Sequence, residues 1–425
     1  MTGGLFSLAA RSAWNRRFVL SLVVVSIALS TLLLLGIERL RQDVRQNFAQ
    51  SIAGTDLIVG ARTGAVQLLL YSVFRIGSAT NNMAWSSAQA VAAMPGVAWT
   101  IPISLGDSHR GFAVVGTTDA YFAHYRHGGG QVLAFTAGRA FGTGVEGVFE
   151  AVVGADVAER LGYAPGAKVV LSHGDGSFAA NDHADKPFTV VGVLARTGTP
   201  VDRSVHIPLA GMEAIHLDWM AGVPLPALRV SAEQALQRDL APKAVTALLV
   251  GLERRTAVFS TQRRIAEFRA EPLMAILPGV ALDELWEVVG AGERALLATS
   301  GLVAVVSVLG LVAVILAGLD QRRRELAILR AVGAGPRTVA LLLALEGSLV
   351  TLAGLAAGVV ATALAWTLAA PWALNTLGLV LQPLSLGVAE WTWLGLLGAA
   401  GLLASAVPGW RAYRIALADG LQARV

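Results

Sequence analysis

The sequence contains no cysteine in its 425 residues. Disulfide bonds, thiolate metal sites, cysteine nucleophiles and lipid attachment through cysteine are therefore excluded. Charge is also scarce, because Asp, Glu, Lys and Arg make up only 15% of the chain, against about 25% in a typical soluble domain. The hydrophobic fraction is 55% and the mean hydropathy is +0.61. These values indicate an integral membrane protein.

Motifs for nucleotide binding and nucleophilic catalysis are missing as well. The stretch "GYAPGAKVV" (162–170) has glycines and a lysine, but it lacks the Gly-Lys-Ser/Thr ending of a phosphate-binding loop. The Gly-x-Ser-x-Gly pattern of hydrolases does not occur. The net charge of +4 comes mainly from arginines at the ends of apolar runs, where they act as topology signals. We therefore predict no catalytic residue, no cofactor and no nucleic-acid partner.

Four apolar runs are long enough to cross a bilayer, which takes about 20 helical residues. We place these spans at 18–37, 295–319, 345–370 and 391–410. A secretory signal peptide is the alternative for the first run. Its end, "LLLLGIERLRQ", offers no small-x-small cleavage site, so we interpret it as an uncleaved span.

The distribution of arginine predicts the orientation of these spans. Arginines occur in the N-terminal segment 1–17, in the connection 320–344 and in the tail 411–425, whereas the 371–390 loop holds no Lys or Arg. The positive-inside rule then places both termini and the 320–344 connection in the cytoplasm. The 371–390 loop and the large insertion 38–294 fall on the opposite side.

The insertion 38–294 has the size of a domain and a mixed pattern. Its two ends are rich in helix formers, and we expect them to extend the first two spans as a stalk, with Pro272 and Pro278 interrupting the second arm. Between the arms we predict strands in 111–118, 167–173, 188–195 and 227–232, and short helices in 86–94 and 154–162. The predicted fold class is a membrane protein with four transmembrane α-helices and a large α+β extracytoplasmic domain between helices 1 and 2.

All seven histidines lie in this insertion, and the stretch 172–187, "SHGDGSFAANDHADKP", combines two of them with three aspartates. Imidazole and carboxylate groups suit zinc or a similar divalent ion. The alternative is a solvated loop, since polar residues avoid the spans and no HxxxH-type spacing is present. We predict no metal site, and keep a metal-linked transport system as an alternative; its candidate ligands are His173, Asp175, Asp182, His183 and Asp185.

Two short patterns concern the helices themselves. Gly354 and Gly358 form a GxxxG pair in the third span, which we expect to allow close helix packing. In the 320–344 connection, three arginines open "RRRELAILRAVGA" (322–334), whose apolar residues recur at helical spacing. The following Gly-Ala-Gly-Pro favours a helix end. A basic flank that only fixes topology would explain the arginines but not this compact helix with a defined stop.

These segments resemble the MacB/FtsX superfamily of ABC-transporter permeases. The stretch 322–334 is similar to the cytoplasmic coupling segment of that family, and "PGWRAYRIALADGLQ" (408–422) to its closing motif. In the insertion, "MPGVAWTIPI" (94–103), "AVVGADVAERLGYAPGAKVVL" (151–171) and "FTVVGVLARTGTPVDRSVHIPL" (188–209) resemble its periplasmic core.

The resemblance implies a permease of the bacterial inner membrane that pairs with a second copy or a paralogue. A separate cytoplasmic ABC ATPase dimer would bind ATP-Mg and contact the coupling segment, and a periplasmic adaptor or substrate-binding protein is a further implied partner. The residues implied in ATPase coupling are Arg322, Arg323, Arg324, Glu325, Leu326, Leu329 and Arg330. Two functions stay open: extrusion or release of a substrate, and FtsX-like signalling to an external partner.

Overall fold

A computed structural model of the chain describes residues 16–174, 182–220, 223–224, 230–321, 328 and 331–421. The chain divides into two compact units. The helical unit comprises Met1–Asp43, Val289–Trp372 and Leu381–Val425, and the α+β unit comprises Val44–Val288 and Ala373–Val380.

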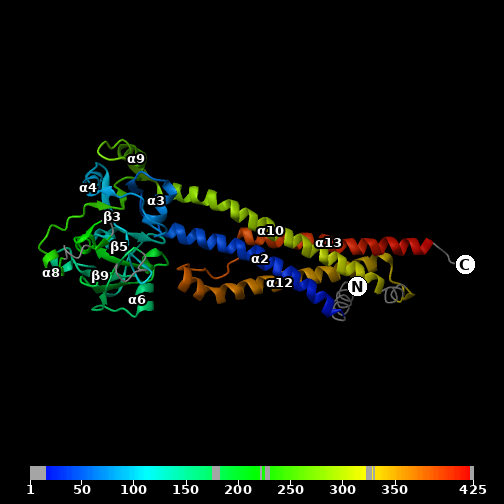
Figure 1. The fold of residues 1–425 in the computed structure, drawn as a ribbon. Helices are drawn as coiled ribbons and strands as arrows, with labels where there is room; N and C mark the ends of the chain where they lie inside the picture. The colour runs from blue at the N-terminus through cyan, green and yellow to red at the C-terminus, as the bar shows by residue number, and fades with distance from the viewer. Residues whose placement is uncertain are drawn as a thin grey trace. The chain divides into compact units, whose positions relative to one another are not determined.

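Four long helices, α2, α10, α12 and α13, form the helical unit (Figure 1). They span Arg17–Gln50, Pro278–Gln321, Pro336–Leu377 and Val388–Leu421. Each has an apolar stretch long enough to cross a membrane. Large apolar side chains such as Leu22 and Leu309 are 63% and 61% exposed, which suits contact with lipid. The predicted four-helix membrane fold with an α+β domain between the first and second helices is confirmed.

A four-stranded antiparallel sheet lies in the α+β unit, in the order β18-β1-β17-β3. Its strands span Leu273–Ile276, Leu57–Ala61, Ala247–Leu252 and Val97–Ile103. Every residue of β1 and β17 is buried, as expected for central strands with unbroken apolar sequences. In this sheet Leu57 pairs with Val250, and Val59 pairs with both Leu248 and Ala275.

A mixed eight-stranded sheet is the larger sheet of this unit, in the order β10-β12-β9-β13-β5-β4-β11, with β8 also paired to β12. The β12–β9 and β13–β5 pairs are parallel. The strands span Lys168–Val169, Phe188–Leu194, Glu150–Val153, Ser204–Pro208, Phe112–Thr117, Asp107–His109, Ser172–His173 and Phe135–Gly138. The strands predicted in 111–118, 167–173 and 188–195 are thereby confirmed, although 167–173 forms two short strands, β10 and β11, that pair with different partners.

Short helices connect these strands. They are α3 (Ala65–Ser72), α4 (Trp85–Ala92), α5 (Ala120–His124), α6 (Ala155–Leu161), α7 (Leu209–Ile215), α8 (Ala232–Ala235) and α9 (Val258–Ala266), with 3-10 turns η1 (Val145–Gly147), η3 (Pro200–Arg203) and η5 (Arg255–Ala257). Small two-stranded pairs are β2–β16 (Met83–Ala84, Ala244–Val245), β6–β7 (Arg126–His127, Gln131–Val132) and β14–β15 (Trp219–Met220, Val223–Pro224). Helices α4 and α6 confirm the two predicted short helices.

The prediction of a helical second arm for the stalk is partly wrong. Residues Leu273–Ile276, placed there among helix formers, form strand β18 at the edge of the four-stranded sheet. Pro272 and Pro278 isolate this short segment from both neighbouring helices, and pairing with β1 buries Leu273 and Ile276. Tertiary pairing therefore overrides local helix preference here. Helix α10 begins at Pro278, which suits the first turn of a helix.

Candidate functional site

The predicted coupling residues Arg322, Arg323, Arg324, Glu325, Leu326, Leu329 and Arg330 lie outside the described residues. Two apolar residues of the same segment are described. Ile328 is 64% exposed and Val332 is 84% exposed. The Val332 amide donates to the Ile328 carbonyl at 3.0 Å, the i to i−4 bond of an α-helical turn. The turn then ends at Gly333, with φ of +100°, before α12 starts at Pro336.

Helices α2 and α12 pack closely at the two glycines of the GxxxG pair. A Cβ atom at Gly354 would lie 2.7 Å from Ile27 Cβ, and one at Gly358 would lie 2.4 Å from Thr31 Cβ. Such distances leave no room for a side chain, so glycine is needed at both positions for this helix contact.

Helices α2 and α10 are joined by a serine cluster inside the helical unit. The hydroxyl of Ser307 on α10 lies 2.8 Å from that of Ser26 and 2.7 Å from that of Ser30, both on α2. Ser30 and Ser307 are 1% and 4% exposed. Hydrogen bonds between neighbouring helices in an apolar surrounding favour one register, so this cluster stabilises the packing of α10 against α2.

The same two helices meet again inside the α+β unit. The Phe48 ring of α2 lies 5.4 Å from the Trp286 ring of α10 and 4.3 Å from Phe74, which follows α3. At the start of α10, Ala281 and Leu282 are buried in the main apolar core of this unit. These aromatic contacts anchor the ends of both helices in the α+β unit.

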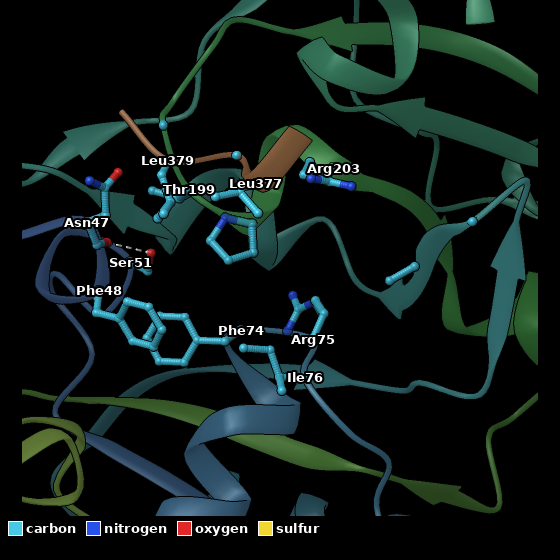
Figure 2. Close-up of a pocket in the computed structure, with 15 residues that line it drawn as sticks. Asn47, Phe48, Ser51, Phe74, Arg75, Ile76, Thr199, Arg203, Leu377 and Leu379 are labelled. Carbon is cyan, nitrogen blue, oxygen red and sulfur yellow. Dashed lines mark hydrogen bonds between the residues drawn. The ribbon is translucent and has the colours of Figure 1, made fainter. Parts of the chain in front are cut away.

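A cavity of about 340 Å³ opens beside this aromatic contact (Figure 2). Its lining combines Phe48 and Phe74 with two arginines, Arg75 and Arg203. Leu377, the last residue of α12, and Leu379 just beyond it complete one side. The cavity therefore offers an aromatic surface and cationic groups to whatever enters it.

Hydrogen bonds from residues that line this cavity hold segment 373–380 in place. The Asn47 side chain donates to Val380 O at 2.9 Å and accepts from Val380 N at 3.1 Å. Arg203 Nη1 donates to Thr376 O at 2.7 Å. Gly378, with φ of +70°, allows the turn that brings Arg203 against the segment. Segment 373–380, which includes the end of α12, thus belongs to the α+β unit together with the ends of α2 and α10.

The histidine-rich stretch is only partly brought together by the fold. His173 and His183 lie close to each other and to two residues that the sequence did not indicate, Asp107 and His216. Asp182 instead bonds to Ser172, and Asp185 pairs with Lys186. Asp175 lies outside the described residues. The non-local partners could not be recognised in the sequence, because strand pairing and a distant helix position them.

Two family models match the chain. The MacB-like periplasmic core domain matches residues 19–263, and the FtsX-like permease C-terminal domain matches residues 297–417. The chain is also similar to two solved structures. One is the periplasmic region of MacB from Actinobacillus actinomycetemcomitans, with 10% identity and a TM-score of 0.35, covering 56% of this chain and 97% of that one.

The other is the extracellular domain of the noncanonic ABC-type transporter YknZ from Gram-positive bacteria, with 12% identity and a TM-score of 0.31, covering 52% of this chain and 99% of that one. No curated protein matches the chain. Both matching models describe domains of transport components. Since the periplasmic core model alone matches more than half of the 425 residues, the chain belongs to the MacB/FtsX-type ABC-transporter permeases, a family of multi-pass membrane proteins.

Proposed function

We propose that this permease couples ATP hydrolysis by a separate cytoplasmic ATPase to movement of its α+β unit, for extrusion or release of a substrate. The observation that carries the proposal is the pair of exposed apolar residues Ile328 and Val332, joined by an i to i−4 backbone hydrogen bond. In the sequence they lie next to the densest arginine cluster of the chain. Protein–protein interfaces commonly have apolar side chains at their centre and charged or polar residues around them.

Helix α10 provides the path from this turn to the α+β unit. It runs without interruption from Pro278 to Gln321, directly before the coupling segment. Its first residues are buried in the core of the α+β unit, and strand β18 precedes them. Movement of the coupling segment would therefore be carried along one helix to the sheet and to the Phe48–Trp286 contact. Coupling over such a distance needs discrete elements of this kind.

Such movement would change the shape of the cavity beside Phe48, and with it the binding of a ligand there. Its walls come from α2, from the end of α3, from η3 and from segment 373–380. A shift of α10 against α2 would change the position of Phe48, one of the lining residues. In this proposal the cavity opens or closes with the ATPase cycle, while the chain itself uses no cofactor.

Reconstitution tests the proposed coupling. The full chain in lipid nanodiscs should retain a cytoplasmic ABC ATPase from the same cell and raise its rate of ATP hydrolysis. Retention is expected at a ratio of one permease per ATPase chain, as a dimer of each would give. If the candidate ATPases do not bind the permease, and their rate of ATP hydrolysis does not change in its presence, the proposed coupling is wrong.

The proposed orientation follows from the arginine distribution and has its own test. Because the native chain has no cysteine, single cysteines introduced at Ser12, Arg337 and Arg424 report only on those positions. In intact cells they should be shielded from an impermeant thiol reagent, whereas one at Ser177 should be labelled. Labelling of the Arg337→Cys variant without permeabilisation would contradict a cytoplasmic coupling segment in the bacterial inner membrane.

A further inference from the structure

Asp107, His173, His183 and His216 converge from four places in the α+β unit. Asp107 begins β4 and stands opposite His173 of β11 in the antiparallel pair. His183 follows the bridge between Ser172 and Asp182, and its amide donates to Leu171 O. His216 caps the C-terminal end of α7. The four side chains are therefore held by strand pairing and a helix end rather than by a single loop.

The distances among their nitrogen and oxygen atoms are those of a metal coordination shell. Asp107 Oδ1 lies 3.0 Å from His173 Nδ1, 3.3 Å from His216 Nε2 and 4.0 Å from His183 Nε2. His173 Nδ1 and His216 Nε2 are 3.2 Å apart, and all four candidate ligand atoms lie within 4.8 Å of one another. A tetrahedral zinc site with bonds of about 2.0–2.1 Å has ligand separations of about 3.3 Å. Small side-chain adjustments would therefore close this shell around one ion.

One hydrogen bond to a group outside the cluster determines which nitrogen of His216 can act as a ligand. The Nδ1 atom of His216 lies 2.8 Å from Met212 O, and a carbonyl can only accept, so Nδ1 carries the proton. In neutral His216 the Nε2 atom then carries a lone pair, and it lies 3.3 Å from Asp107 Oδ1 and 3.2 Å from His173 Nδ1. Metal-binding histidines are commonly oriented in this way by a backbone carbonyl.

Two buried polar atoms in the cluster lack a hydrogen bond among the described residues. They are Asp107 Oδ2 and His183 Nε2. The side chains of Asp107 and His183 are 0% and 1% exposed. Leaving such a group without a partner costs about 1–3 kcal/mol, and an ion coordinated by His183 Nε2 would remove that cost at His183. This observation points to a ligand independently of the clustering itself.

Trp219 covers the cluster and shapes its surroundings. Its ring centroid lies 4.7 Å from that of His183 and 5.1 Å from that of His173. The side chains of His173 and His216 remain 33% and 27% exposed, so an ion could enter from their side. An apolar cover combined with one accessible side keeps competing water away while allowing exchange.

A hydrogen-bond network without metal is the competing explanation. Burial raises the pKa of Asp107, but hydrogen bonds from His173 and His216 outweigh it and bring the pKa to about 2. Burial lowers the pKa of His183 to about 4, so His183 is neutral near pH 7. Burial lowers the pKa of His216, but the hydrogen bond to Asp107 outweighs burial and raises it, so an imidazolium at His216 would satisfy Asp107 without metal. The two explanations differ in what they predict on adding metal.

We propose that Asp107, His173, His183 and His216 bind one divalent transition-metal ion, with Zn²⁺ as the best fit. Three imidazoles and one carboxylate suit zinc in tetrahedral geometry, whereas Mg²⁺ and Ca²⁺ prefer all-oxygen shells. Four protein ligands leave no open position, so the ion serves structure, regulation or metal-linked transport rather than hydrolysis. The site does not depend on the proposed coupling to an ATPase.

Metal titration of the full chain in detergent, after treatment with a chelator, tests this site. We expect one Zn²⁺ per chain, bound in competition with a chromophoric chelator and not displaced by excess Mg²⁺. Co²⁺ in its place should give the intense visible bands of a tetrahedral complex, which a hydrogen-bond network cannot produce. His183→Ala and Asp107→Asn should weaken Zn²⁺ binding by about 100-fold or more, since even outer-shell changes cost about 10–100-fold.

His124→Ala is the matched control, because His124 stacks on Trp99 away from the cluster and should leave binding unchanged. His173→Ala, at a partly exposed position, serves if the buried variants fail to fold. Wild-type protein that is monodisperse and binds no stoichiometric Zn²⁺ would overturn the proposal. Wild-type affinity in a folded His173→Ala or His183→Ala variant would overturn it too.

Discussion

Glu325→Lys is expected to abolish stimulation of the partner ATPase while leaving the permease in the membrane. The variant reverses one charge within the proposed coupling segment and keeps Arg322, Arg323 and Arg324, which fix the topology. If this segment contacts the ATPase, a like-charge contact at a small interface costs about 2 kcal/mol or more. That corresponds to about a 30-fold loss of affinity. Leu329→Asp should have the same effect by removing an apolar anchor.

Co-purification and the rate of ATP hydrolysis in nanodiscs measure this loss. Glu253→Lys is the matched control, because Glu253 is an exposed acidic residue of the α+β unit and its reversal should not affect the ATPase. A segment that serves only as a basic flank would tolerate Glu325→Lys. Wild-type values for both Glu325→Lys and Leu329→Asp, with normal insertion, would therefore contradict the coupling role.

The membrane part of the fold could be predicted from the sequence because it depends on local composition. Four apolar runs, in which Glu346 is the one charged residue, and the arginines at their ends are enough to indicate four spanning helices, and α2, α10, α12 and α13 contain them. Strands β5 and β12 were predictable for the same reason, since their apolar sequences are bounded by turn residues. Strand β18 was not, because only pairing with β1 makes its four residues extended.

The candidate sites depend on contacts between distant residues, which a single sequence does not reveal. His173 faces Asp107 through the register of β4 and β11, and His216 joins them from the end of α7. A search for metal-ligand spacing within one stretch therefore found two of the four residues. The cavity is a similar case, because Phe48, Phe74 and Leu377 come from three separate segments.

Cross-linking α2 to α10 is expected to stop the cycle of the complex. The hydroxyl oxygens of Ser30 and Ser307 are 2.7 Å apart, so cysteines at these positions can form a disulfide with little movement. The chain has no other cysteine, so the introduced pair has no competing partner. If ATP-driven movement shifts α10 against α2, the oxidised protein cannot complete that movement.

A second disulfide separates this effect from general rigidity. Lys168 and Thr189 are cross-strand neighbours in β10 and β12, within one sheet of the α+β unit. The Lys168→Cys/Thr189→Cys pair joins two strands that move together in this proposal, so its oxidation should leave the hydrolysis rate unchanged. Single Ser307→Cys protein controls for the loss of the serine hydrogen bonds.

The most direct measurement is the permease-stimulated rate of ATP hydrolysis by the reconstituted complex carrying Ser30→Cys/Ser307→Cys, before and after reduction. If ATP-driven movement passes through α2 and α10, the oxidised complex should hydrolyse ATP only at the unstimulated rate of the ATPase. Reduction should restore the stimulated rate in the same sample. A stimulated rate that is the same in the oxidised and reduced samples, with the disulfide verified by mass spectrometry, would contradict the proposed transmission of ATP-driven movement through this permease.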